Sequence, residues 1–248
     1  MASAVIAPDP PIPHVTLVLA MSLDGKIADA QGGAARFSST ADLSHLEAQV
    51  AAADGVLFGG GTLRAYGTTL SVRNPNLLAQ RRQRQQPEQP IQIVWSPSGN
   101  LDPDFRYFQQ PVPRGLVTTQ ANAPRWVQSG LFDTIWPLPE ARTQPWDWPW
   151  VLAQFEAAGI NTLALLGGGR LAAELLRCGC VHEVFITVCP LILGGTTAPT
   201  PVAGEGFLAA AAPRLQLLSH QVVDGEVFLH YRVCPTSAPG DNFLYPGE

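Results

Sequence analysis

The sequence of 248 residues contains few charged side chains and a single lysine. Charged residues make up 14%, against roughly 25% in a typical soluble domain, so the surface must rely on Gln, Ser, Thr, Asn and backbone groups. The formal net charge of −5 is mild and supplies no field for binding a nucleic-acid backbone. Lys26 is the only lysine among 15 cationic residues. The composition therefore argues against a nucleic-acid partner.

No apolar stretch is long enough to cross a membrane, and no secretory signal is recognisable. The longest apolar run, Val15–Met21, is far shorter than the roughly 20 residues that a membrane-spanning helix needs. Residues 1–13 are rich in proline and alanine and lack a basic segment followed by an unbroken apolar core. We therefore predict a flexible N-terminal tail over residues 1–13 and a cytoplasmic protein.

Several signatures of catalysis and metal binding are also missing. None of the four cysteines has the C-x-x-C spacing of a zinc or redox site, so we expect reduced thiols and no metal at Cys178, Cys180, Cys189 and Cys234. No G-x-S-x-G motif indicates a serine nucleophile. The G-x-G-x-x-G and Walker patterns are absent as well. The chemistry is therefore expected to depend on a bound cofactor.

Apolar runs of strand length alternate with helical segments along most of the chain. This alternation predicts one α/β domain over residues 14–234, with a largely parallel sheet flanked by helices. The capping-box spacing of Ser39 and Asp42 predicts a helix that runs to about Ala53. Two further helices are predicted over residues 149–158 and 170–178. The predicted strands are residues 15–20, 56–58, 91–95, 115–118, 133–136, 161–166 and 184–188.

The end of the domain and one long connection have their own signals. Asp224-Gly225 separates two apolar runs and predicts a C-terminal β-hairpin, because both turn positions favour positive φ. Residues 235–248 are expected to form a loose tail. Residues 67–90 form a long connection, in which the Gln- and Arg-rich segment 80–89 is predicted to be a solvated helix or a flexible segment. A division into two domains, as the alternative, would fall within residues 76–90.

Three tryptophans alternate in the segment Trp146–Trp150. A helix with proline at an early position is predicted to begin here, so we expect the tryptophans to anchor its start onto the core. A partner-binding surface is the alternative interpretation.

Two strand-to-helix junctions carry three consecutive glycines. In Gly59–Thr62 and Gly167–Arg170, a buried strand leads through the glycines to the start of a helix. A helix start offers free backbone N–H groups and a partial positive charge, and glycine lets a phosphate approach the backbone closely. Ligands bind at the carboxyl ends of the strands in an open α/β sheet, so we expect the two junctions to form one anion-binding site. Thr62 and Arg170 would add a hydroxyl and a cation.

The segment Ala20-Met-Ser-Leu-Asp-Gly-Lys-Ile-Ala28 follows the first predicted strand and is a specific motif. With it, residues 14–233 resemble the reductase domain of the bacterial riboflavin-biosynthesis deaminase/reductase. The resemblance implies a dihydrofolate-reductase-like α/β fold and a homodimer. It also implies hydride transfer from NADPH to a ribosylaminopyrimidine phosphate, 5-amino-6-(5-phosphoribosylamino)uracil, whose ribose opens to a ribityl chain. The deaminase half is excluded because its H-x-E and P-C-x-x-C zinc motifs are missing.

The resemblance further implies roles for individual residues. Leu70 and Arg73 would contact the substrate, with Arg73 at its phosphate. Asp24 and Lys26, on the loop beside the pocket, would be catalytic, although turn chemistry alone would also account for them. The residues that would contact NADPH are Ala20, Thr62, Ser96, Gly168, Gly169, Arg170 and Leu171.

Several substrate-side positions depart from the family pattern. Tyr66-Gly-Thr68 stands in place of Asp-Asp-Pro, Leu166 in place of Glu, Val50 in place of a phosphate-binding Arg, and Ala34 in place of Ser. Loss of a buried glutamate removes a hydrogen-bonding anchor worth about 1–3 kcal/mol where its partner stays unpaired. Three hypotheses therefore stay open: the riboflavin-pathway reductase, a related NADPH-dependent reductase for a pterin or another heterocycle, and a non-catalytic homologue that binds a nucleotide or a partner.

Overall fold

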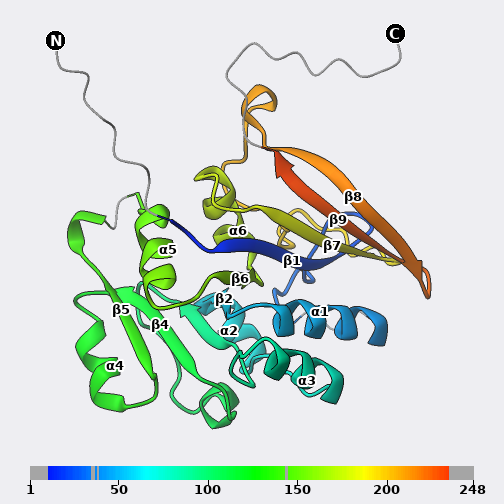
Figure 1. The fold of residues 1–248 in the computed structure, drawn as a ribbon. Helices are drawn as coiled ribbons and strands as arrows, with labels where there is room; N and C mark the ends of the chain where they lie inside the picture. The colour runs from blue at the N-terminus through cyan, green and yellow to red at the C-terminus, as the bar shows by residue number, and fades with distance from the viewer. Residues whose placement is uncertain (1–10, 35–36, 38, 143–144, 235–248) are drawn as a thin grey trace, which may run out of the picture.

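The computed structural model describes residues 11–34, 37, 39–142 and 145–234. Nine strands form one sheet in the order β5-β4-β3-β2-β6-β1-β7-β9-β8 (Figure 1). The strands are β1 (His14–Ser22), β2 (Gly55–Gly59), β3 (Ile91–Trp95), β4 (Arg114–Thr119), β5 (Thr134–Leu138), β6 (Thr162–Leu165), β7 (Glu183–Cys189), β8 (Arg214–Val223) and β9 (Glu226–Cys234). The predicted tail 235–248 and most of the predicted tail 1–13 lie outside the described residues.

The sheet is parallel from β5 to β7 and antiparallel at its C-terminal edge. Every neighbouring pair from β5 to β7 runs parallel. The last two pairs, β7 with β9 and β9 with β8, are antiparallel. The α/β class, the mostly parallel sheet and the C-terminal hairpin are therefore confirmed. β2 and β3, on either side of the connection 67–90, pair directly with each other in this sheet.

Helices cover both faces of the sheet, as Figure 1 shows. One core lies between the sheet and α5 (Trp148–Ala157) and α6 (Gly169–Arg177). The other lies between the sheet and α1 (Thr40–Ala52), α2 (Gly60–Tyr66), α3 (Pro75–Gln83) and α4 (Ala123–Ser129). Short 3-10 turns occur at Arg106–Gln109, Glu140–Arg142 and Ala209–Ala211. Burial on both faces explains why the central strands are continuous apolar runs.

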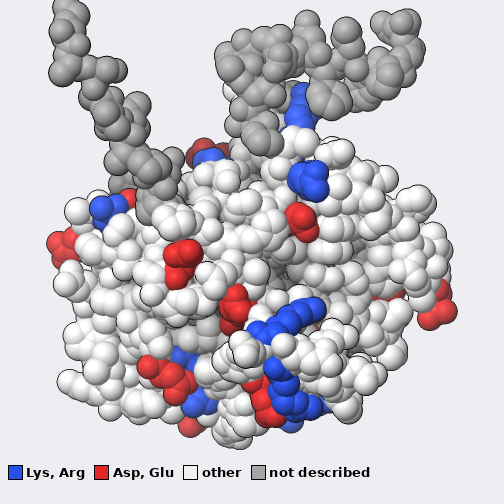
Figure 2. Space-filling model, viewed as in Figure 1, with Lys and Arg blue, Asp and Glu red and all other residues white. Residues whose placement is uncertain are grey.

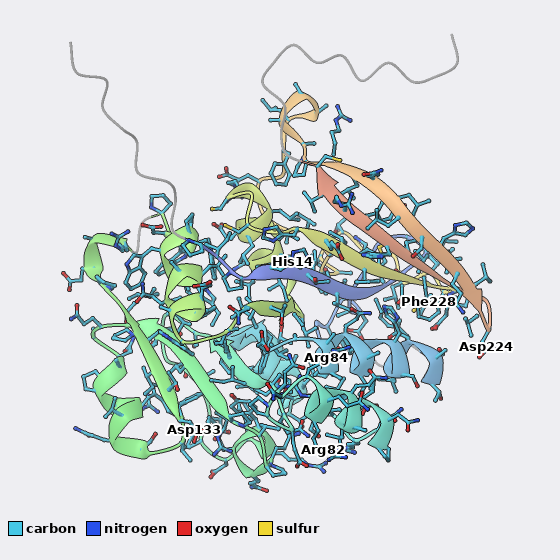
Figure 3. All side chains as sticks on the ribbon, in the orientation of Figure 1. His14, Arg82, Arg84, Asp133, Asp224 and Phe228 are labelled. Atoms are coloured by element: carbon cyan, nitrogen blue, oxygen red, sulfur yellow. The ribbon has the colours of Figure 1, made fainter. Side chains whose placement is uncertain are left out.

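The hairpin turn has the geometry that its sequence predicts. Asp224 and Gly225 both have positive φ, 51° and 82°, and Asp224 lies at the tip of the β8–β9 hairpin in Figure 3. Arginine and acidic side chains are sparse on the face in Figure 2, as the low charge content requires. No helix of the described part of the chain is long and apolar enough to cross a membrane.

The prediction for residues 80–89 is wrong in one respect, because the segment is not wholly solvated. Arg81, in the last turn of α3, is fully buried. Its guanidinium donates to the carbonyl oxygens of Ala51 (2.9 Å), Ala53 (2.6 Å) and Pro87 (2.8 Å). A cation can be buried when backbone acceptors replace its hydration, and this one ties α3 to the end of α1. Composition alone does not reveal such a contact.

The tryptophan segment anchors the start of α5 onto the core, as predicted. The Asp147 side chain accepts a hydrogen bond from Trp150 N (3.0 Å) and caps the helix. Trp148 is fully buried. Arg142 forms an ion pair with Asp147 and lies over the Trp150 ring. Of the three tryptophans in this segment, Trp146 lines the cavity described in the next section, whereas Trp148 and Trp150 do not.

Candidate functional site

A cavity of about 1140 Å³ opens at the carboxyl ends of the central strands. Its walls come from the ends of β1, β2, β3 and β6, from α1 and α2, and from residues 196–204 of the long loop before β8. The volume exceeds the roughly 300–1,000 Å³ of a typical small-molecule pocket and suits two ligands side by side.

The two glycine junctions lie next to each other in this cavity. β2 and β6 are parallel neighbours, so both junctions leave the same edge of the sheet. Gly59 N donates a hydrogen bond to Gly167 O (2.8 Å). A Cβ atom built on Gly168 would lie 3.5 Å from the Thr62 hydroxyl of the other junction. The predicted single site at adjacent strand ends is thus what the fold creates.

The three glycines of the second junction have different physical reasons. Gly167 has φ +80°, which glycine adopts without strain. A Cβ on Gly169 would lie 2.1 Å from Thr200 O, so no side chain fits there. Gly168 has extended backbone and only an ordinary contact for an added Cβ. Packing does not require glycine at Gly168, so its bare backbone is available to a ligand.

All seven residues predicted to contact the cofactor line this one cavity. Gly168 is the N-cap of α6 and has no side-chain cap, so the first N–H groups of this nine-residue helix lack a capping side chain. Arg170 is exposed at the same end, and it follows Gly169 directly. The residues are Ala20, Thr62, Ser96, Gly168, Gly169, Arg170 and Leu171.

We call the part of the cavity lined by these seven residues the cofactor half, and two further features of it are not evident from the sequence. Arg64, on α2, lines the cavity and donates to Asn100 O (3.0 Å). Trp95 and Trp146 also line it and pack edge to face, with ring centroids 5.2 Å apart. They meet only because β3 and the segment before α5 fold together. The β3 side of the cavity therefore has an aromatic wall.

The predicted substrate residues separate in the structure. Leu70 lines the cavity, whereas Arg73 is exposed and borders a second hollow of about 390 Å³. Glu47 of α1 accepts from the backbone N–H groups of Arg73 (2.5 Å) and Asn74 (2.7 Å) and fixes this loop. The roles of Leu70 and Arg73 stay predictions.

Asp24 organises the turn after β1. Its carboxylate accepts hydrogen bonds from the Ser22 hydroxyl (2.6 Å) and from Leu193 N (3.1 Å) and Gly194 N (2.7 Å). These donors lower the pKa of Asp24 to about 2, with Ser22 as the largest cause. Neither Asp24 nor Lys26 is among the cavity-lining residues, but Ile27 is. These contacts fit the turn interpretation, and the catalytic role of Asp24 and Lys26 stays a prediction.

Of the positions expected to depart from the family pattern, three line the cavity. They are Tyr66, Thr68 and Leu166. Val50 is fully buried in the core beneath α1, so this position forms no part of the cavity wall. Ala34 is described but does not line the cavity. The expected departures at Tyr66, Thr68 and Leu166 therefore bear directly on the cavity, whereas those at Val50 and Ala34 lie outside its lining.

A buried acidic cluster adjoins the cavity at the start of α1. Ser39 caps α1 by accepting from Ala41 N (3.0 Å) and Asp42 N (3.1 Å), so this part of the capping box is confirmed. The other part differs, because Ser39 N donates to Glu226 of β9 (2.9 Å) instead of to Asp42. Glu226 also accepts a hydrogen bond from the Ser39 hydroxyl. Burial, followed by the neighbouring Glu226, raises the pKa of the Cys189 thiol to about 12.

Metal binding has no support in the described residues, where no group of three His, Cys, Asp or Glu side chains could hold an ion. The four cysteines are free thiols. The fold and the glycine-lined cavity together define an α/β domain whose candidate ligand site lies at the carboxyl ends of parallel strands.

Comparison with known proteins identifies the family. Residues 13–229 match the RibD C-terminal domain, so the chain belongs to this family. It is 29% identical over 222 residues to the 2,5-diamino-6-ribosylamino-4(3H)-pyrimidinone 5′-phosphate reductase of Methanothermobacter thermautotrophicus, covering 89% of this chain and 98% of that protein. It is 31% identical over 191 residues to the riboflavin biosynthesis protein RibD of Synechocystis sp., covering 76% of this chain but only 48% of that longer protein.

A solved structure supports the same fold. The pyrimidine reductase-like protein of Corynebacterium diphtheriae superposes with a TM-score of 0.76 at 18% identity, over 90% of this chain and 92% of that chain. The predicted resemblance to the reductase domain is confirmed.

Proposed function

We propose that this protein is an NADPH-dependent reductase of riboflavin biosynthesis that converts a ribosylaminopyrimidine 5′-phosphate into its ribityl form. The observation that carries the proposal is the single cavity in which both glycine junctions meet at adjacent strand ends. The printed names of the relatives, a pyrimidinone phosphate reductase and a RibD protein, support the substrate class.

The cofactor half of the cavity fits a dinucleotide. The pyrophosphate would lie over Gly168 and the start of α6, which lines the cavity and has no side-chain cap. β3 and β1 lie three strand spacings apart, or about 14 Å. A dinucleotide could therefore place its adenosine near Trp146 and its nicotinamide near Ala20. Arg170 is the proposed partner of the 2′-phosphate that distinguishes NADPH from NADH.

The substrate half would hold the pyrimidine beside β1, where the nicotinamide of bound NADPH supplies the hydride. Reduction at C1′ of the ribosylamino group would break the C1′–O4′ bond, and O4′ would take up a proton. Asp24 is proposed to fix the turn that carries Lys26, and the cationic Lys26 to supply that proton. Leu70 would contact the substrate in the cavity, with Arg73 at its phosphate.

A second candidate is a related reductase for a pterin or another heterocycle. Tyr66 and Leu166, two of the altered positions that line the cavity, favour it because an aromatic ring and an aliphatic side chain stand where the family resemblance implies polar groups. A homodimer and a cytoplasmic location complete the proposal, as expected for the family.

Absorbance at 340 nm tests the proposal directly. We expect NADPH to be oxidised when the protein meets a ribosylaminopyrimidine 5′-phosphate, and NADH to be a poorer donor. NADPH binding without oxidation by any ribosylaminopyrimidine phosphate would favour the second candidate. Absence of NADPH binding would contradict both.

A further inference from the structure

Glu226, the first residue of β9, is a buried carboxylate whose hydrogen-bond partners come from distant parts of the chain. Its residue is 2% exposed. Its two oxygens accept from Ser39 N (2.9 Å) and from the Ser39 hydroxyl (2.5 Å), 187 positions earlier in the sequence. Cys189 of β7 is a further hydrogen-bonding neighbour. Burial of a carboxylate is unfavourable unless such donors replace its water, so the contact with Ser39 is a specific feature of this fold.

Glu226 takes the place that a capping box gives to a residue of the helix itself. In that motif, the side chain three residues after the N-cap accepts from the N-cap N–H group, and in α1 this residue would be Asp42. The Ser39 hydroxyl does accept from Asp42 N (3.1 Å), but Ser39 N donates to Glu226 instead. The Asp42 side chain is therefore released from the capping role, and Asp42 lines the cavity.

The first turns of α1 form the part of the cavity wall that this contact fixes. Asp42, Leu43 and Leu46 line the cavity from α1. The helix packs against β1, the strand beside which the pyrimidine is proposed to bind. None of the seven residues that line the cofactor half lies on α1. The contact with Glu226 therefore acts on the substrate side of the cavity.

The rest of α1 is held by contacts that do not involve Glu226. At its carboxyl end, Arg81 donates to two backbone carbonyl oxygens. In its middle, the His45 ring packs edge to face on Phe185 of β7 and on Phe228 of β9, which Figure 3 labels, with ring centroids 5.2 and 5.3 Å apart. Loss of the Glu226 contact should therefore release the first turn and leave the helix in place.

We propose that Glu226 is a positioning residue for the substrate, which acts through Ser39 to keep Asp42 and the first turn of α1 on the cavity wall. The proposal rests on the proposed function, which assigns α1 to the substrate side. The C-terminal hairpin then takes part in substrate binding, although Glu226 itself is not among the cavity-lining residues. Without the Glu226 carboxylate, Asp42 can accept from Ser39 N in an ordinary capping box and turn away from the cavity.

Steady-state kinetics of Glu226→Gln test the proposal, with NADPH and the ribosylaminopyrimidine 5′-phosphate that the wild type reduces fastest. Glutamine keeps the size of the side chain but turns an NH₂ group toward one of the two Ser39 donors. KM for the pyrimidine phosphate should rise about tenfold, the equivalent of one charge-assisted hydrogen bond. The value of kcat and the affinity for NADPH should stay within about twofold of the wild type, because only the substrate wall moves.

Glu183→Gln is the matched control. Glu183 lies on β7, its carboxylate is 2.8 Å from His230 Nε2, and it does not line the cavity. Both variants lose a buried or half-buried carboxylate from the same part of the sheet, so a general loss of stability would lower the thermal midpoint and the activity of both alike. We expect KM for the pyrimidine phosphate to rise in Glu226→Gln alone.

A double-mutant cycle tests the route through Ser39. The increase in KM caused by Glu226→Gln should be smaller in a Ser39→Ala background, because both substitutions break the same contact. Fully additive effects would mean that Glu226 acts by another route and would overturn the proposal.

The other outcomes also decide the proposal. An unchanged KM in Glu226→Gln, or an equal loss of NADPH affinity, would overturn the positioning role while the reductase function stands. If Glu226→Gln does not fold, Ser39→Ala breaks the contact from the other side, and an unchanged KM in that variant would overturn the proposal. If the wild type oxidises NADPH with no ribosylaminopyrimidine phosphate, the proposed function fails and this proposal fails with it.

Discussion

The two halves of the cavity differ in what lines them: bare backbone in the cofactor half and side chains in the substrate half. The cofactor half includes the bare backbone of Gly59–Gly61, Gly168 and Gly169. At Gly59, Gly61 and Gly168 an added Cβ would meet only ordinary contacts, so packing does not explain the missing side chains there. The substrate half consists of side chains on α1, α2 and the following loop, such as Asp42, Tyr66 and Leu70. A backbone site tolerates little change in sequence, whereas a side-chain site can acquire a new specificity by single substitutions.

Gly168→Val should break the cofactor half most severely. The extended backbone of Gly168 accepts a branched residue, but its side chain would cover the N–H groups at the start of α6. We expect NADPH affinity to fall by more than about 100-fold, from the loss of one or two charge-assisted hydrogen bonds. Titration by fluorescence or calorimetry measures this, and the thermal midpoint should stay near that of the wild type.

Gly169→Ala is the control variant for Gly168→Val, because it should affect the stability of the fold first. Its Cβ would lie 2.1 Å from the backbone oxygen of Thr200, so the fold itself must shift and the thermal midpoint should fall. Unchanged NADPH affinity in Gly168→Val would show that this junction is only a helix cap, and the distinction between the two halves would fail.

Arg73→Ala should affect the substrate alone. Loss of a phosphate partner at an exposed position should raise KM for the pyrimidine phosphate about tenfold and leave NADPH affinity unchanged. Steady-state kinetics checks this, with Arg82→Ala as a control at another exposed arginine. An unchanged KM would mean that another cation, such as cavity-lining Arg64, holds the phosphate. Equal loss for both ligands would mean that Arg73 is structural.

The amino end of the sheet serves as a reference region, because we expect a substitution there to have the smallest effect of those considered and to change stability only. His182 Nδ1 accepts from Val15 N (3.0 Å), and burial, followed by the neighbouring His14, lowers the pKa of His182 below its ordinary 6.5. The unfolded chain then binds more protons, so the unfolding free energy should fall as the pH drops from 7 to 5.

In His182→Asn, an amide oxygen can replace the ring acceptor and does not titrate. The loss of stability between pH 7 and pH 5 should be shallower by a few tenths of a kcal/mol, because the ring is only half-buried. Denaturant unfolding at both pH values measures the slope, and NADPH affinity should not change. A slope equal to that of the wild type would assign the pH dependence to other groups, such as His45, whose pKa burial also lowers.

Sequence reasoning reached the features that local chemistry determines. The Asp224-Gly225 turn, the Ser39 cap and the two glycine junctions have signals within a few residues, and all three were predictable. Arg81 and Asp42 were not, because their burial depends on elements that pack against them from elsewhere in the chain. The same limit applied to α4 and to the aromatic wall at Trp146.

The central claim is that one cavity divides into a backbone cradle for the dinucleotide and a side-chain wall for the pyrimidine. A crystal structure of the NADPH complex tests it most directly. The account predicts the pyrophosphate against Gly168 and the start of α6, with the nicotinamide toward Ala20 and the space beside Asp42 open. A pyrophosphate bound away from both glycine junctions would contradict it.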